Sequence, residues 1–447
     1  MHGRQNETLD TITLLLANIT IVHSFARVVL KQFAPRANRQ CCNAKLGARP
    51  PARAYGGMPF PRWLPPLLGV LIAVGPVSTD MYLPAFPAIE AALGGRPGTA
   101  QVTLATWFAG LAAGQIAQGT LADRFGRRLP LILGTALYTL ASAGCALSPD
   151  LPTLAFMRFL AAFGGSASMV IPRAIVRDLA DGHAAARLMS RLMLVMGVAP
   201  ILAPSLGGLV LRVADWHTIF WIAALYGVVC CIVVALALPE TLPPRARIRL
   251  GPLALAGRYV TVARERSFVS HAMILSGTSF VTFAYLGGSP DVFITLFQLA
   301  PSQYGAVFGA CAAGFIAASQ INPLLLQRVG GSRLLRGGVL GSLVATVTLA
   351  ALAMGGVGPW WAYAGCVLVN AASNGFSNPN ATVGALSRHG AHAGSASALM
   401  GTLQFSLGAV SGLLVGVLAD GTARPMALLM LLGATVAAVA DRARPGG

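Results

Sequence analysis

The ten residues GTLADRFGRR, at positions 119–128, join two long apolar runs and decide the fold of this chain. They place Asp123, Arg124, Arg127 and Arg128 within six positions, although only 10% of all residues are charged. A loop of this kind lies in water between two membrane helices. Because short loops rich in arginine are retained in the cytoplasm, it also predicts the direction in which the chain crosses the membrane.

The composition independently predicts a membrane protein. Hydrophobic residues make up 55% of the 447 residues and the mean hydropathy is +0.69, well above the usual balance of a soluble domain. A hydrocarbon core about 30 Å thick requires about 20 apolar residues in a helix, and twelve runs reach this length. They cover approximately residues 65–88, 100–120, 130–148, 152–176, 188–211, 217–238, 268–297, 303–326, 334–354, 359–385, 395–418 and 425–440. The sequence therefore predicts an all-α membrane protein with twelve transmembrane helices.

The net charge of +18 would also suit a protein that binds nucleic acid. The distribution of this charge along the chain decides between nucleic-acid binding and membrane topology. If the odd-numbered connections are external, that side carries only Arg96, Arg212 and Arg424. The other side carries both tails and arginines at positions 124, 127, 128, 173, 177, 187, 191, 245, 247, 249, 258, 264, 266, 328, 333, 336 and 388. This asymmetry predicts cytoplasmic termini. Membrane topology explains the charge, and we expect no nucleic-acid partner.

The chain divides into four predicted parts. Residues 1–60 are basic and only weakly apolar, so we expect a disordered cytoplasmic extension. Met58, just before the first span, is a candidate start of translation. A six-helix bundle at 61–238 and a second at 267–447 flank a cytoplasmic loop at 239–266 that is rich in proline and arginine.

A weak internal repeat relates the two halves, as is common in transporters. The loops after the second and the eighth apolar run share three residues at one offset: Leu121, Arg124 and Gly126 in the first loop, and Leu325, Arg328 and Gly330 in the second. Asp123 is replaced by Gln327 in the second copy. The sequence therefore predicts two pseudo-symmetric bundles.

Several functional classes find no support in the sequence. The seven cysteines have no paired CxxC spacing, so we expect neither a metal nor a disulfide framework. ATP-driven transport needs a phosphate-binding loop with lysine, and both lysines, Lys31 and Lys45, precede the first span. His271 could carry a proton, but a helix-end histidine without a carboxylate nearby in sequence is the simpler interpretation. No HExxH, GxSxG or DDxxD motif occurs, which leaves a membrane-embedded enzyme as a remote alternative.

Five motifs resemble a known transporter family. GTLADRFGRR resembles the signature loop of the major facilitator superfamily, and GVAPILAPSLGG at 197–208 resembles its antiporter motif. Three further motifs narrow the resemblance to Bcr/CflA drug efflux proteins: STDMYLPAFPAI, RFLAAFGGSA and GSASALMGTLQF. The resemblance spans about residues 62–440. The resemblance implies two rocking six-helix bundles that export drugs across the bacterial inner membrane. It further implies coupling to the proton gradient without a cofactor, and we expect a monomer.

Two ionisable residues stand out because a charge near mid-membrane costs several kcal/mol. Asp80 lies about 22 Å above the cytoplasmic surface and Arg158 about 9 Å below the outer surface, at 1.5 Å rise per residue. These depths nearly coincide, so the two side chains could pair or face one central cavity. The resemblance implies that Asp80 exchanges protons and drug groups and that Arg158 tunes it. The alternatives are a helix-end cap beside Pro84 for Asp80 and a snorkelling anchor for Arg158.

Neutral polar residues are candidates for the substrate cavity. Asn370, Asn374 and Asn378 repeat at four-residue spacing, which puts them on one helical face with Asn380 close by. This face either lines the cavity or bonds neighbouring helices. The predicted cavity residues are Tyr82, Asn370, Asn374 and Gln404, with Gln115 as a weaker candidate. Glu90 and Asp291 are expected at outer helix ends; for Asp291, water exposure is favoured over a second acidic site.

The signature loop and the antiporter motif are predicted to control conformation. The loop residues Gly119, Asp123, Arg124, Gly126, Arg127 and Arg128 would form a charge network that holds one state and breaks in another. Glycines at its two ends would permit close packing and a tight turn. In the antiporter motif, prolines would kink the helix and small residues would allow close helix contact: Gly197, Pro200, Pro204, Gly207 and Gly208.

The sequence thus favours proton-coupled efflux of drugs or other small amphipathic molecules by alternating access. Uptake of a small metabolite by proton symport remains the alternative, because it uses the same fold and much the same charges. Only the antiporter motif argues against it.

Overall fold

The computed structural model describes residues 63–94, 98–179, 182–247, 252–387 and 393–444. The predicted extension at 1–60, with its candidate start at Met58, lies outside these residues.

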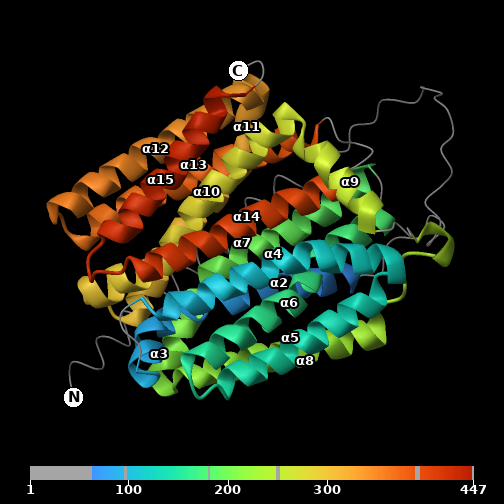
Figure 1. The fold of residues 1–447 in the computed structure, drawn as a ribbon, viewed down its shortest axis with the longest axis horizontal. Coiled ribbons are helices and arrows are strands. Elements are labelled where there is room, and N and C mark those ends of the chain that lie inside the picture. Colours follow the sequence, from blue (N-terminus) through green and yellow to red (C-terminus); the bar gives the residue numbers. More distant parts are fainter. Residues whose placement is uncertain (1–62, 95–97, 180–181, 248–251, 388–392, 445–447) are drawn as a thin grey trace, which may run out of the picture.

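The N-terminal half contains six membrane-spanning units, of which the first is broken. Its helices are α2 (Leu64–Asp80), η1 (Leu83–Ala85), α3 (Phe86–Ala92), α4 (Ala100–Phe125), α5 (Arg128–Ala146), α6 (Leu151–Leu179), α7 (Gly182–Val213) and α8 (Trp216–Ala237). In Figure 1 they form the blue-to-green bundle. The sequence predicted one unbroken span at 65–88, and the structure corrects this prediction. The helix breaks after Asp80, because Pro84 and Pro87 lack the N–H groups that would continue the helical bonding of α2 into α3.

The C-terminal half forms the second bundle, yellow to red in Figure 1. Its helices are α10 (Arg266–Pro290), η3 (Asp291–Leu296), α11 (Pro301–Val329), α12 (Gly331–Gly355), α13 (Trp360–Leu386), α14 (Ala393–Val417) and α15 (Arg424–Arg442). η3 is a π-helical turn that continues α10. The described residues thus contain the predicted twelve spans, if α2 and α3 are taken as one and η3 as part of α10.

Two short helices occupy the connection between the bundles: η2 (Pro244–Ala246) and α9 (Pro252–Ala263). The sequence predicted only a loop here, because the segment is rich in proline and arginine. α9 has too few residues to cross a membrane. α9 packs against α10 and α14, beside one end of the bundles in Figure 1.

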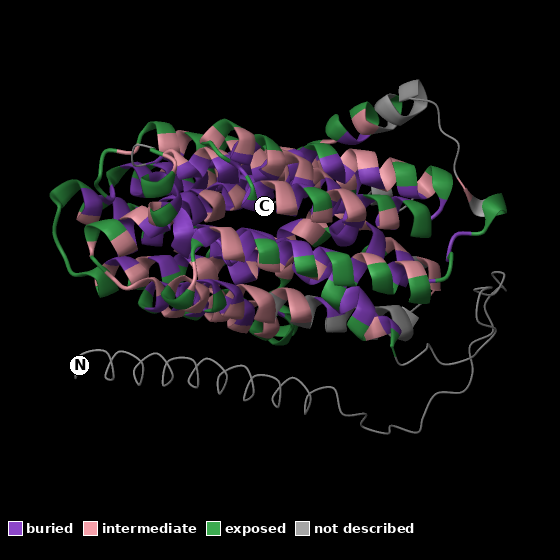
Figure 2. Cartoon of the chain, turned by 90° about the horizontal axis from the view of Figure 1, so that it is seen from below, coloured by how far each residue is buried: buried purple, intermediate pink, exposed green. Residues whose placement is uncertain are grey.

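Polarity differs between the spans. Among the described residues, nine helices are long and apolar enough to cross a membrane on composition alone. α4, α7 and α13 are the three long helices outside that group. α4 and α13 bury amide side chains, including Gln101, Gln115, Asn370 and Asn374. These amide side chains therefore lie in the protein interior. Figure 2 shows how buried and exposed positions are distributed over the helices.

Glycine contacts bring neighbouring helices close together. A Cβ on Gly164 of α6 would lie 2.6 Å from the carbonyl oxygen of Gly134 and 2.7 Å from the nitrogen of Tyr138, both in α5. The repeated loops also share a glycine with a left-handed backbone, at Gly126 (φ 97°) and Gly330 (φ 85°). Each ends a helix one or two residues before the next begins, so the weak repeat of the sequence corresponds to the same turn in both bundles.

We predict that Gly164→Leu destabilises the N-terminal bundle by about 1–3 kcal/mol or more, because the backbone of α5 cannot yield to the added side chain. Thermal unfolding of the purified protein in detergent measures this. Gly337→Leu on α12 is the matched control, since a Cβ there meets nothing within 4 Å. Equal melting temperatures for both variants would contradict the prediction.

Candidate transport site and gates

Asp80 is the last residue of α2 and lies where the first span breaks. Its side chain is buried, with 6% of its surface exposed. The turn η1, which begins three residues after Asp80, packs against α10 and α11 of the C-terminal bundle. Asp80 therefore lies close to the interface between the two bundles.

Arg158 of α6 is held inside the N-terminal bundle. Its Nη1 donates a hydrogen bond of 2.9 Å to the carbonyl oxygen of Ser78, two residues before Asp80. Its guanidinium carbon lies 4.1 Å from the ring centre of Tyr82 and 4.3 Å from that of Trp107. Stacking of this kind favours a cation in a low-dielectric interior. With 2% of its surface exposed, Arg158 is not a snorkelling anchor.

The sequence left open whether Asp80 and Arg158 pair. In the described part of the chain, no carboxylate oxygen lies within 4 Å of Arg158, and its Nε and Nη2 have no hydrogen-bond partner. The two side chains therefore reach the same level of the first span without forming an ion pair.

Tyr82 belongs to the wall around Arg158. Its hydroxyl bonds the hydroxyl of Thr103 over 2.9 Å, and its ring is 1% exposed. The prediction that Tyr82 lines the substrate cavity is therefore not met in this conformation, in which its ring covers the guanidinium instead.

The asparagines of α13 bond neighbouring helices, which corrects the prediction for Asn370. Ser342 of α12 donates to Asn370 over 2.7 Å, whereas Thr278 of α10 donates to Asn378 over 2.9 Å. Each four-residue step turns a side chain by about 40° around the helix, so the predicted shared face divides between two neighbours. Asn380 bonds Asn322 of α11 over 2.8 Å. Asn374 is 2% exposed and its Oδ1 has no partner among the described residues, so it stays a candidate.

Gln404 and Gln115 lie near the interface between the bundles. Gln404 of α14 is half-buried and accepts a 3.3 Å hydrogen bond from Ser279 of α10. Gln115 of α4 borders Gly401, where a Cβ would lie 3.3 Å from its Oε1. Thr402 donates to the carbonyl oxygen of Ala112 over 3.3 Å. α4 and α14 thus meet through polar groups.

The outer gate, as we call the contacts between bundles at the arginine-poor end predicted to be external, is closed. A Cβ on Gly208 of α7 would lie 2.8 Å from the carbonyl oxygen of Pro301, and one on Gly305 of α11 would lie 2.8 Å from Cα of Ser205. A Cβ on Gly416 of α14 would lie 3.0 Å from the Cβ of Gln101 in α4. These contacts form two glycine-lined crossings, α7 with α11 and α4 with α14.

The antiporter motif shapes the first crossing. Pro200 and Pro204 lie inside α7, where Pro204 also contacts Gly305. A Cβ on Gly207 would overlap the carbonyl oxygen of Met81, next to Asp80. The motif therefore touches both the break in the first span and the other bundle. Gly197, the first residue of the motif, lies outside the residues whose side-chain surroundings the structure describes.

Polar bonds reinforce the outer gate. Gln101 Nε2 donates to Asp291 Oδ2 over 2.7 Å and to the carbonyl oxygen of Gly287 over 3.1 Å. Arg212 of α7 donates to the hydroxyl of Ser302 over 2.8 Å. Asp291 directly follows the last residue of α10 and is bonded across the bundles, so it is not simply exposed to water, as the sequence had favoured.

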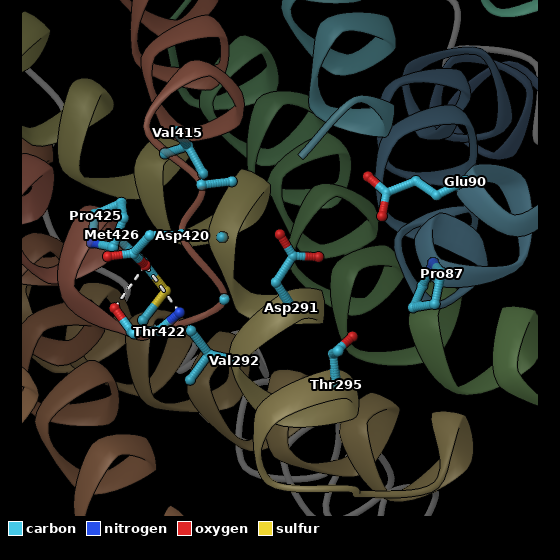
Figure 3. A pocket seen from close by; sticks show the side chains of 13 residues that line it. Pro87, Glu90, Asp291, Val292, Thr295, Val415, Asp420, Thr422, Pro425 and Met426 are labelled. Carbon is cyan, nitrogen blue, oxygen red and sulfur yellow. Dashed lines mark hydrogen bonds between the residues drawn. The ribbon is translucent and has the colours of Figure 1, made fainter. Parts of the chain in front are cut away.

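A cavity of about 270 Å³ opens beside these bonds, lined by Glu90, Asp291 and Asp420 among others (Figure 3). Glu90 accepts from the backbone nitrogens of Gly98 and Ala100, which caps α4. Hydrogen bonding from Thr422 holds the pKa of Asp420 below its usual value, so Asp420 stays ionised.

The signature loop forms a charge network centred on Arg127, which is 3% exposed. It contacts Asp123 at 2.6 Å and Asp178 of α6 at 2.7 Å, while its backbone nitrogen donates to Glu240 over 2.8 Å. Burial opposes the charge on Arg127, but the hydrogen bonds that it donates to the two aspartates prevail and raise its pKa. Arg128 donates to the carbonyl oxygen of Ala235 over 2.5 Å. Every partner named here belongs to the N-terminal bundle or to the segment just after it.

The other residues of the signature loop differ in what they contact and in the backbone conformation that they adopt. Gly126 has the left-handed backbone that the predicted tight turn requires. Gly119 does not enforce close packing, because a Cβ there would lie 3.8 Å from Val170, an ordinary contact. Arg124 stacks on the ring of Phe125 at 5.5 Å. Sequence reasoning missed Asp178 and Glu240, two acidic side chains at or just after helix ends on the arginine-rich side, where the topology rule leads one to look for arginine.

The sequence profile of the Major Facilitator Superfamily matches residues 68–413. The chain belongs to the major facilitator superfamily. Members of this superfamily in the comparison are named as transporters and not as enzymes, so the chain is a multi-pass membrane transporter of small molecules.

Three relatives indicate which members of the superfamily this chain is similar to. The MFS-type transporter YdgK of Bacillus subtilis (strain 168) is 35% identical over 380 residues, covering 84% of this chain and 93% of the relative. The bicyclomycin resistance protein homolog of Haemophilus influenzae is 30% identical over 369 residues, 83% and 92% of the two chains. The multidrug resistance protein MdtL of Escherichia coli is 27% identical over 256 residues, 57% and 64%. These relatives support the predicted Bcr/CflA resemblance.

Solved structures show the same fold at low identity. A D-xylose-proton symporter superposes with a TM-score of 0.66 at 15% identity, covering 84% of this chain and 96% of the symporter. A POT family transporter gives 0.68 at 13% identity, with coverages of 88% and 96%. The major facilitator fold is thereby confirmed.

We predict that Gly208→Leu lowers transport by about five- to 150-fold, because the added side chain collides with the backbone of Pro301 and opposes outer closure by about 1–3 kcal/mol. Transport rates normalised to membrane protein measure this. Gly365→Leu is the control, since a Cβ there meets nothing within 4 Å. A fully active Gly208→Leu variant would show that closure does not need this crossing.

We predict that Asp123→Asn and Asp178→Asn lower turnover for chemically different substrates by one common factor, with binding in detergent nearly intact. The effect of Asp178→Asn should be larger, because its side chain is 12% exposed against 44% for Asp123. Asp150→Asn in an outer loop is the control, since asparagine caps a helix equally well. Loss of some substrates with full transport of others would instead place the loop in recognition.

Proposed function

We propose that the chain exports drugs or other small amphipathic molecules across the bacterial inner membrane in exchange for protons. It acts as a monomer, both termini face the cytoplasm, and the proton gradient is the energy source in place of a cofactor. The observation that carries this proposal is the position of Asp80, a buried carboxyl group at the break of the first span, close to where that span meets α10 and α11 of the other bundle.

A carboxylate in this position can couple two processes. A buried ionised group needs compensation, which a proton or a cationic or polar drug group can supply. Proton and drug then compete for Asp80, and the state of Asp80 affects the contact between the bundles because η1, just after Asp80, packs against α10 and α11. Arg158 acts as a positioning residue through its bond to the carbonyl oxygen of Ser78.

The direction of transport is supported by two further observations. The antiporter motif makes tight contact with both Met81 and Pro301, so it links the break beside Asp80 to the outer gate. Two relatives are named for resistance to bicyclomycin and to multiple drugs. The predicted cavity residues Asn374 and Gln404 would contact the substrate once the bundles separate.

Proton-coupled uptake is the second candidate, because a structural neighbour is a D-xylose-proton symporter. The fold is common to both functions and does not choose between them. Measuring accumulation and efflux of the same compound under an imposed proton gradient separates them: a symporter accumulates the compound with the proton, and an exporter expels it.

We predict that Asp80→Asn abolishes proton-driven efflux, because the amide keeps the size of the side chain but cannot titrate. Asp80→Glu should retain part of it. Ethidium efflux from a pump-deficient bacterium expressing each variant measures this, with Asp420→Asn as the control for a carboxylate outside the span. Undiminished, gradient-dependent efflux by Asp80→Asn would move the coupling role to another residue.

A further inference from the structure

The bond between Gln101 and Asp291 leaves one group unsatisfied. Gln101 is fully buried, at 0% exposure, and its Nε2 donates both to Asp291 Oδ2 and to the carbonyl oxygen of Gly287. These two acceptors fix the orientation of the amide, because exchanging its nitrogen and oxygen would place the amide oxygen against two other acceptor oxygens. Gln101 Oε1 then remains buried without a hydrogen-bond partner among the described residues. An acceptor in this situation needs a donor, or it carries a desolvation cost.

An ionised Asp291 cannot supply that donor, whereas a protonated one can. A carboxylate only accepts hydrogen bonds, and a carboxylic acid has one O–H to give. A carboxylic acid and a primary amide can exchange two hydrogen bonds, N–H to the acid carbonyl and O–H to the amide oxygen. The first of these bonds is present at 2.7 Å, and Gln101 Oε1 is free for the second.

We propose that Asp291 is a second proton-binding site, which closes the outer gate when protonated from the external side. The bond joins α4 of one bundle to the end of α10 in the other, so its strength contributes directly to closure. The cavity of about 270 Å³ gives Asp291 a route for protons independent of Asp80. Asp291 also opens the π-helical turn η3, a feature frequent at functional sites.

Two other acidic side chains lie around Asp291. Figure 3 shows its carboxyl group between Glu90 and Asp420, which line the same cavity. The titratable and charged groups on the elements around it are Glu90 of α3, Tyr304 of α11, Asp420 after α14 and Arg424 at the start of α15. An ionised Asp291 would therefore meet like charges in this cavity, whereas a protonated one would not.

The predicted direction follows from these contacts. At low external pH, Asp291 is protonated, both bonds to Gln101 form and the outer ends stay together. At high external pH, the carboxylate faces an unpaired buried amide oxygen and Glu90, so the outer ends separate. This inference rests on the proposed alternation between two states, but not on the role of Asp80 in coupling.

The test is a distance measured between the outer ends by double electron–electron resonance. Spin labels are attached at Val213 and Val357, which are 88% and 57% exposed on opposite bundles. Both positions carry p-acetylphenylalanine, labelled through its ketone so that all native cysteines remain. The labelled full-length protein in lipid nanodiscs, without substrate or gradient, is compared at pH 5 and pH 8.

We expect the short distance to dominate at pH 5, with the ratio of open to closed protein rising about tenfold or more at pH 8. Asp291→Asn mimics the neutral acid and should stay closed at both pH values. Gln101→Met keeps the bulk but not the amide, and should be about tenfold more open at pH 5. Asp420→Asn should keep the pH response.

The outcomes separate this site from the coupling site. A wild-type distance distribution that does not change between pH 5 and pH 8 would overturn the inference, as would a full pH response in Asp291→Asn. If Asp80→Asn alone abolishes the response, the proton acts at Asp80; the inference then fails while the proposed function stands. If Asp80→Asn loses efflux only in the transport assay and Asp291→Asn loses only the pH response, both hold.

Discussion

A guanidinium charge inside the N-terminal bundle is the constraint on which the site depends. An arginine away from water is costly unless it is compensated, and Arg158 has three aromatic rings around it and one backbone acceptor, the carbonyl oxygen of Ser78. This bond fixes the first span just before it breaks. The break in turn leaves Asp80 without an ion pair to Arg158 and close to the other bundle, since η1 packs against α10 and α11.

Closure and opening rest on different kinds of contact at the two ends of the protein. At the outer end, glycines bring backbones into direct contact between the bundles, and such packing is either complete or lost. At the other end, Arg127 organises charges within one bundle and the segment after it. The signature loop therefore stiffens the N-terminal bundle as a unit, which a rocking mechanism requires, and the outer gate supplies the contact that must break.

Sequence reasoning reached the topology, the repeat and the residues of interest because each leaves a local signal: apolar runs, loop arginines and rare intramembrane charges. It did not reach the partners, which depend on helix rotation. Asn370 and Asn378 share a spacing but face different neighbours, and Tyr82 covers Arg158 instead of lining a cavity. Asp178 and Glu240 lie far from Arg127 in sequence, and the bond from Gln101 to Asp291 joins residues 190 positions apart.

The central claim is that a proton and a substrate compete for Asp80. It is tested most directly by counting the protons released when ethidium binds to the purified, unbuffered protein in detergent, read with a pH indicator. The account predicts proton release with binding in the wild type, and binding without release in Asp80→Asn. Equal release by both proteins, or binding to the wild type without any release at any pH between 5 and 9, would contradict it.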